Sequence, residues 1–306
     1  MKTLQVSTLV IILVAVVSMT LTAESVIEQA DRLYWADSYD QVVSLITGVL
    51  PTTYNSQEKS ELLWRLSRAT LAIGDEQKAQ GANNATLFAT FEQGQEYAEQ
   101  AIEVYPLARA YTYRASNIGR WGETKGPLNS LSKAKPMRDD LSYAIDTFYA
   151  TDDTIAWYVL GQLYYKLPGR PLSFGNLDTA ISYARMAVDT IPAERNYPGH
   201  YKALAEMLWK RGLSSAKRKT KINSLAKDWN KEKGSTVDRY SYYEGSLGVT
   251  HVPMYSPVAL QDMSDQQEAA MILKYAIAKY DVWPFHSRAD QRTRQEIGEL
   301  LDKWGL

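Results

Sequence analysis

Apolar residues recur along most of the chain at the three- and four-residue spacing of amphipathic helices. Between residues 24 and 50 two such stripes follow one another: Val26, Ala30, Leu33 and Tyr34, then Val42, Val43, Ile46 and Val49. This spacing places apolar side chains on one face of a helix. A polar break at Asp37-Ser38 separates the stripes, and Pro51 follows the second. Residues 24–50 are therefore predicted to form two antiparallel helices.

The clearest helix pair is predicted between residues 154 and 192. Its first half has the spacing W-x2-L-G-x2-Y, and its second half has small residues ahead of a proline: Trp157, Leu160, Gly161 and Tyr164, then Ala180, Ala184, Ala187 and Pro192. This pattern resembles one tetratricopeptide repeat, although Lys166 to Gly175 makes the connection longer than in that family. Because small residues let two helices approach closely, we expect Gly161 and Ala180 to meet at a crossing.

Similar spacing elsewhere extends the helix-pair pattern over residues 24–233. The same small or apolar positions recur in two further segments: Gly94, Ala98, Ala101 and Pro106, and then Tyr201, Leu204, Ala205 and Leu208. Helix ends are expected at Gly74-Asp75 and near Trp121, with a loop over residues 124–128. The sequence thus predicts an all-α, tetratricopeptide-like helix-pair solenoid (an α-α superhelix), with roughly ten to thirteen helices in the mature chain.

The C-terminal part departs from the repeat pattern. Residues 234–263 lack helical periodicity and contain His251 and four tyrosines, namely Tyr240, Tyr242, Tyr243 and Tyr255. A stretch of this length is rarely a plain connector, so we expect a long irregular loop with a role of its own. Residues 264–306 carry two more apolar stripes, which predict helices that cap the solenoid.

The first 23 residues have the character of a targeting segment. Lys2 precedes an apolar run from Leu9 to Val17, and small residues lead to Ala23. This order predicts a secretory signal peptide cleaved after residue 23. Retention as a membrane anchor is the alternative. In either case we expect the body to be exported, and to be periplasmic or envelope-associated.

Composition and motifs narrow the chemistry. The net charge is −1, which does not predict nucleic-acid binding. No cysteine is present, which excludes disulfides and thiol nucleophiles. His200, His251 and His286 are isolated from one another and from any metal-binding motif, and no nucleotide-binding or nucleophile motif occurs. We therefore predict no catalytic residues, no metal and no cofactor.

Charge is unevenly distributed along the chain. Acidic residues outnumber basic ones between Glu24 and Pro106, whereas basic residues dominate between Met207 and Lys233. Two solvated faces are one interpretation. The alternative is that a basic helix, predicted between Ser214 and Lys233, contacts an acidic partner or anionic lipid headgroups. The same charge asymmetry would suit self-association into a homo-oligomer.

Two family resemblances cover roughly residues 25 to 230. The strings YTYRASNIGRWGETKGPLNSL and WYVLGQLYYKLPGRPLSFGNLDTAISYARMAV are similar to bacterial relatives of the regulator-of-microtubule-dynamics family. They also resemble the tetratricopeptide-like T-component associated with tripartite (TRAP) transporters. The second resemblance implies a periplasmic accessory of solute uptake. Its members are often lipoproteins, and the absence of cysteine departs from that pattern.

The functional prediction is a non-catalytic scaffold that binds a protein, a peptide or a small ligand on its concave face. In the repeat family the first helix of each pair lines the groove. Carried onto this chain, that implies a binding surface formed by six residues: Tyr158, Gln162, Tyr165, Lys202, Glu206 and Trp209. Arg65, Thr112 and Ser116 occupy similar positions in earlier pairs. The 234–263 segment is expected to lie across or beside the groove, or to plug it with its tyrosines.

Two alternatives stay open. One is the TRAP-type accessory of solute uptake. The other is a helical enzyme with residues 234–263 as a lid and His251 as general base, which would require a carboxylate within hydrogen-bond reach of that histidine.

Overall fold

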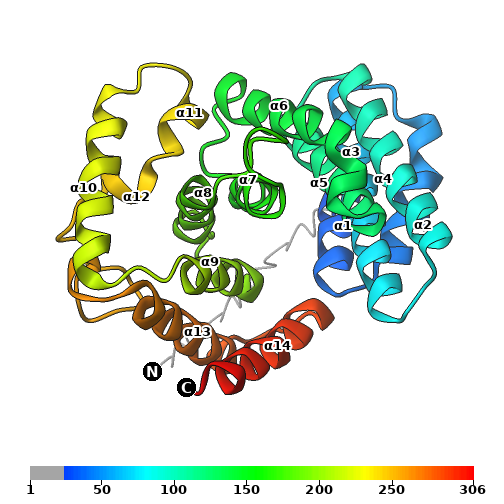
Figure 1. The fold of residues 1–306 in the computed structure, drawn as a ribbon. Coiled ribbons are helices and arrows are strands. Elements are labelled where there is room, and N and C mark those ends of the chain that lie inside the picture. Colours follow the sequence, from blue (N-terminus) through cyan, green and yellow to red (C-terminus); the bar gives the residue numbers. More distant parts are fainter. Residues whose placement is uncertain (1–23) are drawn as a thin grey trace, which may run out of the picture.

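The computed structural model describes residues 24–306 (Figure 1). Over that range all regular elements are helices and no strand occurs, which confirms the predicted all-α solenoid. The predicted signal peptide, residues 1–23, lies outside the described residues. Within residues 24–306 no helix is both long and apolar enough to cross a membrane.

The first eight helices form four consecutive pairs. They are α1 (Val26–Trp35) with α2 (Tyr39–Val49), α3 (Ser56–Ala79) with α4 (Asn84–Val104), α5 (Ala108–Lys125) with α6 (Leu131–Thr147), and α7 (Thr154–Lys166) with α8 (Leu177–Asp189). Short 3-10 turns, η1 (Leu50–Thr52) and η2 (Pro127–Ser130), follow α2 and α5. Polar residues begin several helices: the side chains of Asn55, Asn83, Asp153 and Asn176 each accept a hydrogen bond from a backbone N–H of the first turn.

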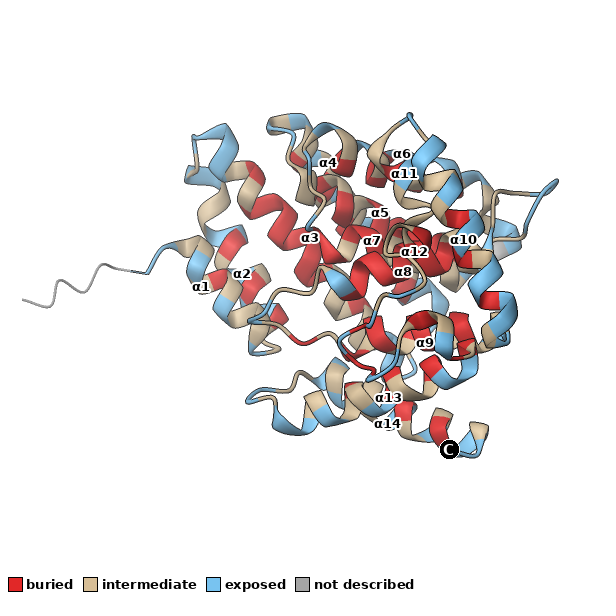
Figure 2. Ribbon diagram, turned by 90° about the vertical axis from the view of Figure 1, so that its left-hand side faces the viewer, coloured by how far each residue is buried: buried red, intermediate tan, exposed pale blue. Residues whose placement is uncertain are grey.

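The crossing predicted for the seventh and eighth helices is confirmed. A Cβ added to Gly161 of α7 would lie 3.2 Å from the backbone nitrogen of Ala184 and 3.3 Å from the carbonyl oxygen of Ala180 in α8. Both neighbours are backbone atoms, which cannot move aside without shifting the helix. Trp157 is fully buried next to this crossing. Figure 2 shows that buried positions gather along α3, α7 and α8.

Two expected helix ends are wrong. Helix α3 continues through Gly74 to Ala79, because Gly74 is a packing residue whose missing side chain leaves room for the ring of Phe91 in α4. Helix α5 continues through Trp121 to Lys125, so most of the residues expected to form its end and the following loop are helical. In both cases a glycine inside the helix allows close contact with a neighbouring helix and does not end the helix.

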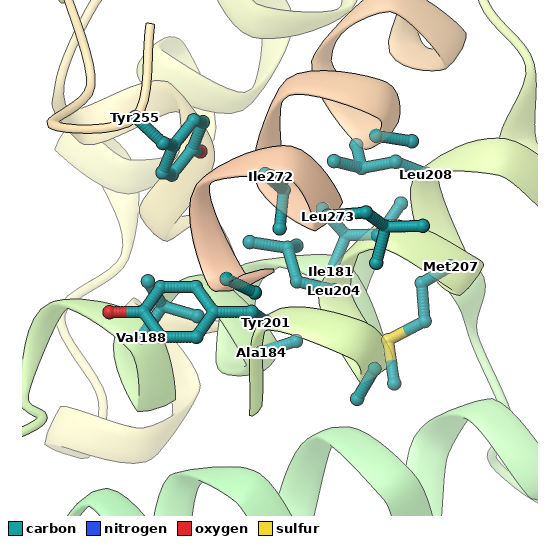
Figure 3. Packing of buried hydrophobic residues seen from close by; sticks show 14 of the residues in the cluster. Ile181, Ala184, Val188, Tyr201, Leu204, Met207, Leu208, Tyr255, Ile272 and Leu273 are labelled. Carbon is teal, nitrogen blue, oxygen red and sulfur yellow. The ribbon is translucent and has the colours of Figure 1, made fainter. Parts of the chain in front are cut away.

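The pairing changes after α8. Helix α9 (Pro198–Arg211) packs against α13 (Asp265–Val282) and not against α10 (Ser215–Lys231), the helix that follows it in sequence (Figure 1). The core between α8, α9 and α13 contains Ile181, Leu204 and Ile272 (Figure 3). The basic helix and the segment after it are thus an excursion between the two helices of one pair.

The 234–263 segment is more regular than expected. It contains two short helices, α11 (Thr236–Tyr240) and α12 (Tyr243–Ser246), and the 3-10 turn η3 (Leu260–Asp262). These bring the α-helices of residues 24–306 to fourteen, above the roughly ten to thirteen expected. The segment's short helical turns carry no amphipathic stripe, because a helix of one turn is too short to show a period.

A buried ionic cluster attaches this excursion to the solenoid. Arg185 of α8 donates hydrogen bonds to Glu268 of α13 and to Glu244 of α12, and all three side chains are almost fully buried. Arg211 binds Glu244 and Asp265, and Arg218 of α10 is bonded to Glu268. The cluster balances three arginines against the acids Glu244, Asp265 and Glu268.

The last helix returns toward the first ones. Helix α14 (Arg288–Trp304) follows α13, and its first turn reaches the end of α1 and α3 (Figure 1). The backbone N–H of Arg288 donates to Asp37 at 2.7 Å, and the guanidinium of Arg292 donates to Glu76 at 2.6 Å. The two ends of the described chain are thereby connected.

Candidate ligand-binding cavity

A cavity of about 230 Å³ lies between α5, α6 and α7. Tyr34 of α1, Leu71 of α3 and His200 of α9 complete its wall. Most of the wall is apolar, and the apolar side chains come mainly from three helices: Ile118, Ala134, Met137, Ile155, Val159 and Leu163. A cavity of this size and lining suits a small organic molecule or one large side chain.

Small residues on α5 leave this space open. Ser116, Gly119 and Gly122 lie at three-residue intervals and therefore share one face of the helix. A Cβ on Gly119 would lie 3.0 Å from the terminal methyl of Met137, and one on Gly122 would lie 3.2 Å from the hydroxyl of Ser130. Helix α5 is therefore in close contact with α6 at Gly119 and with η2 at Gly122, while Ser116 and Ala134 are too short to fill the space beside them.

Charged residues at one side of the cavity are paired with one another. Arg120 lies 2.9 Å from Asp75 of α3 and 3.1 Å from Glu123. Glu123 also accepts from Lys166 of α7 at 2.5 Å. Burial alone would raise the pKa of Glu123, but the charges of Arg120 and Lys166 outweigh it and lower the pKa to about 2. Glu123 is therefore ionised at neutral pH and is paired with Arg120 and Lys166.

Among the residues that line the cavity, His200 has a buried ring nitrogen without a hydrogen-bond partner. Its ring is held between two nearly parallel tyrosine rings, with centroids 4.4 Å from Tyr158 and 4.9 Å from Tyr197. Burial lowers its pKa to about 3, against the opposing effect of a hydrogen bond with the backbone of Thr154. Nε2 is buried and has no partner among the described residues.

Tyrosines surround the same end of the cavity. Burial raises the pKa of Tyr34, Tyr113 and Tyr158, so their hydroxyl groups are protonated at neutral pH. The arginines nearby are already paired with acids: Arg68 is bonded to Asp31, and Arg109 lies 2.9 Å from Asp153. This end of the cavity is therefore polar but carries no uncompensated charge.

The structure separates the six predicted binding residues. Tyr158 and Gln162 line the cavity together. Tyr165 lies under the ammonium of Lys210, 4.5 Å from ring centroid to nitrogen. Lys202 forms ion pairs with Glu206 at 3.6 Å and with Glu296 of α14 at 3.0 Å.

Trp209 does not line the cavity; its ring is stacked on Trp304 of α14 with centroids 4.0 Å apart. Of the earlier candidates, Ser116 lines the cavity, while Thr112 is bonded to Asp153 and Arg65 to Asp31 and Glu61. The structure thus brings Tyr158, Gln162 and Ser116 to one site, and places Lys202, Glu206 and Trp209 near or in the contact between α9 and α14.

The 234–263 segment, all of which the structure describes, contributes no residue to the cavity wall. It packs on the other side of α7 and α8, where Tyr240 stacks on Trp157 at 5.3 Å and the hydroxyl of Tyr183 donates to the carbonyl of Val237. His251 does not line the cavity, and the nearby Asp189 accepts from Tyr243. Within residues 24–306 no hydrogen bond or ion pair joins His251 to a carboxylate, although Asp189 is near enough to interact with it electrostatically.

The basic helix α10 is only partly solvated. Arg218 is fully buried in the ionic cluster, and Lys221 lies 2.9 Å from Asp178. Lys217, Lys219 and Lys227 are exposed. Within residues 24–306 no group of histidine and acidic side chains is arranged to hold a metal ion.

Sequence reasoning missed His200, Tyr34, Arg120 and the wall of α5. The wall was missed because we expected α5 to end near Trp121 and interpreted Gly119 and Gly122 as part of that helix end. A usable signal was present, since Ser116, Gly119, Gly122 and Glu123 recur at helical spacing on one face. No signal pointed to His200, whose ring stacks on Tyr158 of α7 and on Tyr197, the residue that precedes α9.

Comparison with known proteins gives one family and one relative. Residues 26–169 match the family model described as regulator of microtubule dynamics protein 1-3. Over 124 residues the chain is 30% identical to regulator of microtubule dynamics protein 1 of Bos taurus, which covers 40% of this chain and 37% of the bovine protein. The first of the two resemblances is thereby supported for this part of the chain, and the transporter-associated one stays a prediction. Of the residues that line the cavity, His200 alone lies outside the matched segment.

Proposed function

We propose that this protein is a non-catalytic binding protein that holds a small organic ligand in the cavity between α5, α6 and α7. The observation that carries this proposal is a mostly apolar cavity of about 230 Å³, bordered by side chains of six helices. A protein interior is normally filled, so an open cavity of this size supports a site that a ligand completes.

The matched family segment supports the same location. Residues 26–169 supply every cavity-lining residue except His200. A peptide could use the cavity by inserting one large side chain, as the predicted scaffold function requires. The volume of about 230 Å³ and the mostly apolar wall favour a small molecule over an extended peptide, which needs a longer groove.

A ligand screen by thermal shift tests this function. A compound that binds the folded state raises the melting temperature, because it stabilises that state by RT ln(1 + L/Kd), where L is the concentration of free compound. Val159→Trp places an indole in the cavity and should abolish the shift given by true ligands. Val282→Trp is the matched control, since Val282 is 81% exposed and far from the wall in sequence. Ligands that stabilise both variants equally would place the binding site elsewhere.

Export and a role beside a TRAP-type transporter belong to this proposal as its finer part. The apolar run from Leu9 to Val17 supports export, and the transporter resemblance supports the accessory role. N-terminal sequencing of envelope-derived protein should begin near Glu24. Capture of a periplasmic solute-binding subunit by the mature protein would support the accessory role, and an intact Met1 in washed membranes would instead support the anchor.

A further inference from the structure

Helix α4 carries an acidic stripe on its outer side. Its glutamates recur at intervals of three and four residues and therefore lie along one side of the helix: Glu92, Glu96, Glu99 and Glu103. The helix contains no basic residue, and no ion pair among the described residues includes any of the four glutamates. Like charges at this spacing repel one another, so the acidic stripe destabilises the helix that carries it unless a cation lies opposite.

The hydrogen bonds of the acidic stripe do not neutralise it. Three of the glutamates accept from uncharged side chains, namely the indole of Trp121 and the amides of Gln93 and Gln95. Glu92, Glu96 and Glu103 are exposed to solvent, and Glu99 is half-buried. The stripe therefore presents a row of ionised carboxylates at the surface.

Helix α10 carries a lysine face of the opposite sign. Its buried side contains Arg218, Ile222 and Leu225. The rest of its surface exposes four lysines: Lys217, Lys219, Lys227 and Lys231. Lys221 pairs with Asp178, but no ion pair among the described residues includes any of these four. The lysine face is therefore free to bind carboxylates.

The two charged surfaces match in length but are separated within one molecule. At about 1.5 Å of rise per residue, the acidic stripe from Glu92 to Glu103 is about 17 Å long and the lysine face from Lys217 to Lys231 about 21 Å. Figures 1 and 2 both place α4 and α10 on different sides of the molecule. The two surfaces can therefore meet only between copies of the chain.

We propose that the lysine face of α10 in one copy binds the acidic stripe of α4 in a second copy. The contact is head-to-tail, because each copy contributes a different surface, and it leaves one surface of each kind free for a further copy. The net charge of −1 leaves little overall repulsion between copies. This inference does not depend on the proposed ligand-binding function of the cavity.

Sedimentation velocity of the mature protein at pH 7.5 tests the association. Exposed ion pairs are individually weak, so we expect a weak, concentration-dependent increase in mass. It should occur at about 0.02 M salt, where charges act over about 20 Å, and disappear at about 0.5 M salt, where they are screened within about 4 Å.

Two double variants remove one surface each. The stripe variant combines Glu96→Gln with Glu103→Gln, and the lysine variant combines Lys227→Gln with Lys231→Gln. Each variant alone should associate at least about tenfold more weakly than the natural protein, a change of about 1.4 kcal/mol.

A third double variant is the matched control for the lysine variant. Lys274→Gln with Lys303→Gln removes two lysines of α13 and α14 that are also exposed and form no ion pair among the described residues. The net charge changes by the same amount, so association should stay at the natural strength if the position of the lysines matters and not the total charge.

An equal mixture of the stripe variant and the lysine variant tests the geometry. The stripe variant keeps its lysine face, and the lysine variant keeps its acidic stripe. The mixture should therefore regain the natural strength of association but stop at dimers, because the two outer surfaces of each dimer are the substituted ones. This recovery also shows that both variants are folded.

Three results would overturn the inference. One is a natural protein that stays monomeric at low salt. If that monomer instead sediments with vesicles containing phosphatidylglycerol, the lysine face binds anionic headgroups. The second is association of natural strength in either variant alone, and the third is a mixture that fails to form dimers.

Discussion

Helix α8 is held on its two faces by opposite kinds of contact. Toward α7, the small residues Ala180 and Ala184 meet Gly161, and the helices touch backbone to backbone. Toward the excursion, Arg185 is buried between Glu244 and Glu268. The first contact depends on shape and the second on charge balance.

The difference decides how each face responds to change. A close crossing of small residues fails when volume is added. A buried ionic cluster fails when one partner is removed, because the remaining charges stay buried without compensation. The first kind of contact leaves a repeated spacing in the sequence, whereas the second consists of charged residues far apart along the chain.

The largest expected effect is at the ionic cluster. Glu268→Ala leaves Arg185 and Arg218 buried without their main partner and should lower the free energy of unfolding by about 3–5 kcal/mol. Glu296→Ala is the control: this acid pairs with Lys202 but is 52% exposed, so its loss should cost at most about 1 kcal/mol. Denaturant unfolding of both variants measures the difference. Equal, small losses would show that the excursion is held by apolar packing instead.

The crossing of α7 and α8 should be nearly as sensitive. Gly161→Leu places a side chain against the backbone of Ala184 and should cost about 1–3 kcal/mol or more. Gly48 of α2 has no atom within 4 Å of a built Cβ, so Gly48→Leu should leave the stability unchanged or raise it. The midpoints of thermal unfolding compare the two. An unchanged midpoint for Gly161→Leu would contradict the crossing.

His200 at the cavity and Glu268 in the ionic cluster should lose their contributions to stability in different pH ranges. The folded pKa of His200, about 3, lies below its ordinary value of 6.5, so the unfolded chain binds a proton first. Its contribution is complete above pH 6.5 and falls by at most about 1.4 kcal/mol per pH unit below it. Between pH 6.5 and 5.5 we therefore expect a loss of about 1 kcal/mol.

Protonation of Glu268 should also lower the stability, but at lower pH. Burial alone would raise its pKa, but Arg185 and Arg218 lower it to about 2, so its contribution is lost only as the pH falls from about 4.5 toward 2. In His200→Phe the loss between pH 6.5 and 5.5 should disappear while the loss below 4.5 remains. Denaturant unfolding across this range checks both. A loss above pH 5.5 that persists in the variant would assign it to another group.

The smallest effect is expected where α14 meets the N-terminal helices. Arg292 is about one-third exposed and pairs with Glu76, so Arg292→Ala should cost about 0.5 kcal/mol. Arg294→Ala, beside the long and exposed pair with Asp281, is its control and should cost less. Denaturant unfolding of both variants measures the difference between their free energies of unfolding. A loss above 2 kcal/mol would mean that this contact stabilises the whole solenoid.

The sequence predicted the parts of the fold that depend on short-range spacing. The pair α7–α8 and its crossing at Gly161 followed from residues that recur at helical intervals. The change of partner from α10 to α13 could not be predicted, because both helices carry apolar stripes, and the buried acids Glu244 and Glu268 that accompany the observed arrangement pair with residues far away in the sequence. Those acids are paired with arginines on α8 and α10.

The candidate site was predictable in part for the same reason. Tyr158 and Gln162 lie at inner positions of a first helix, which the repeat pattern indicates. His200 and Tyr34 come from helices far apart in the chain, and no spacing connects them. The polar end of the cavity therefore appears only when the solenoid is folded.

The contact between Arg288 and Asp37 joins residues 251 positions apart. In an open array of repeats each unit touches only its neighbours, so either end can unravel first and the chain can fold from many starting points. Here the first and last helices hold one another, and neither end can open without breaking contacts to the other. Long-range closure of this kind slows folding, because the entropy of bringing distant segments together is lost before their contacts form. We expect slower folding and a sharper, more nearly all-or-none unfolding transition than an open array of the same helix content would show.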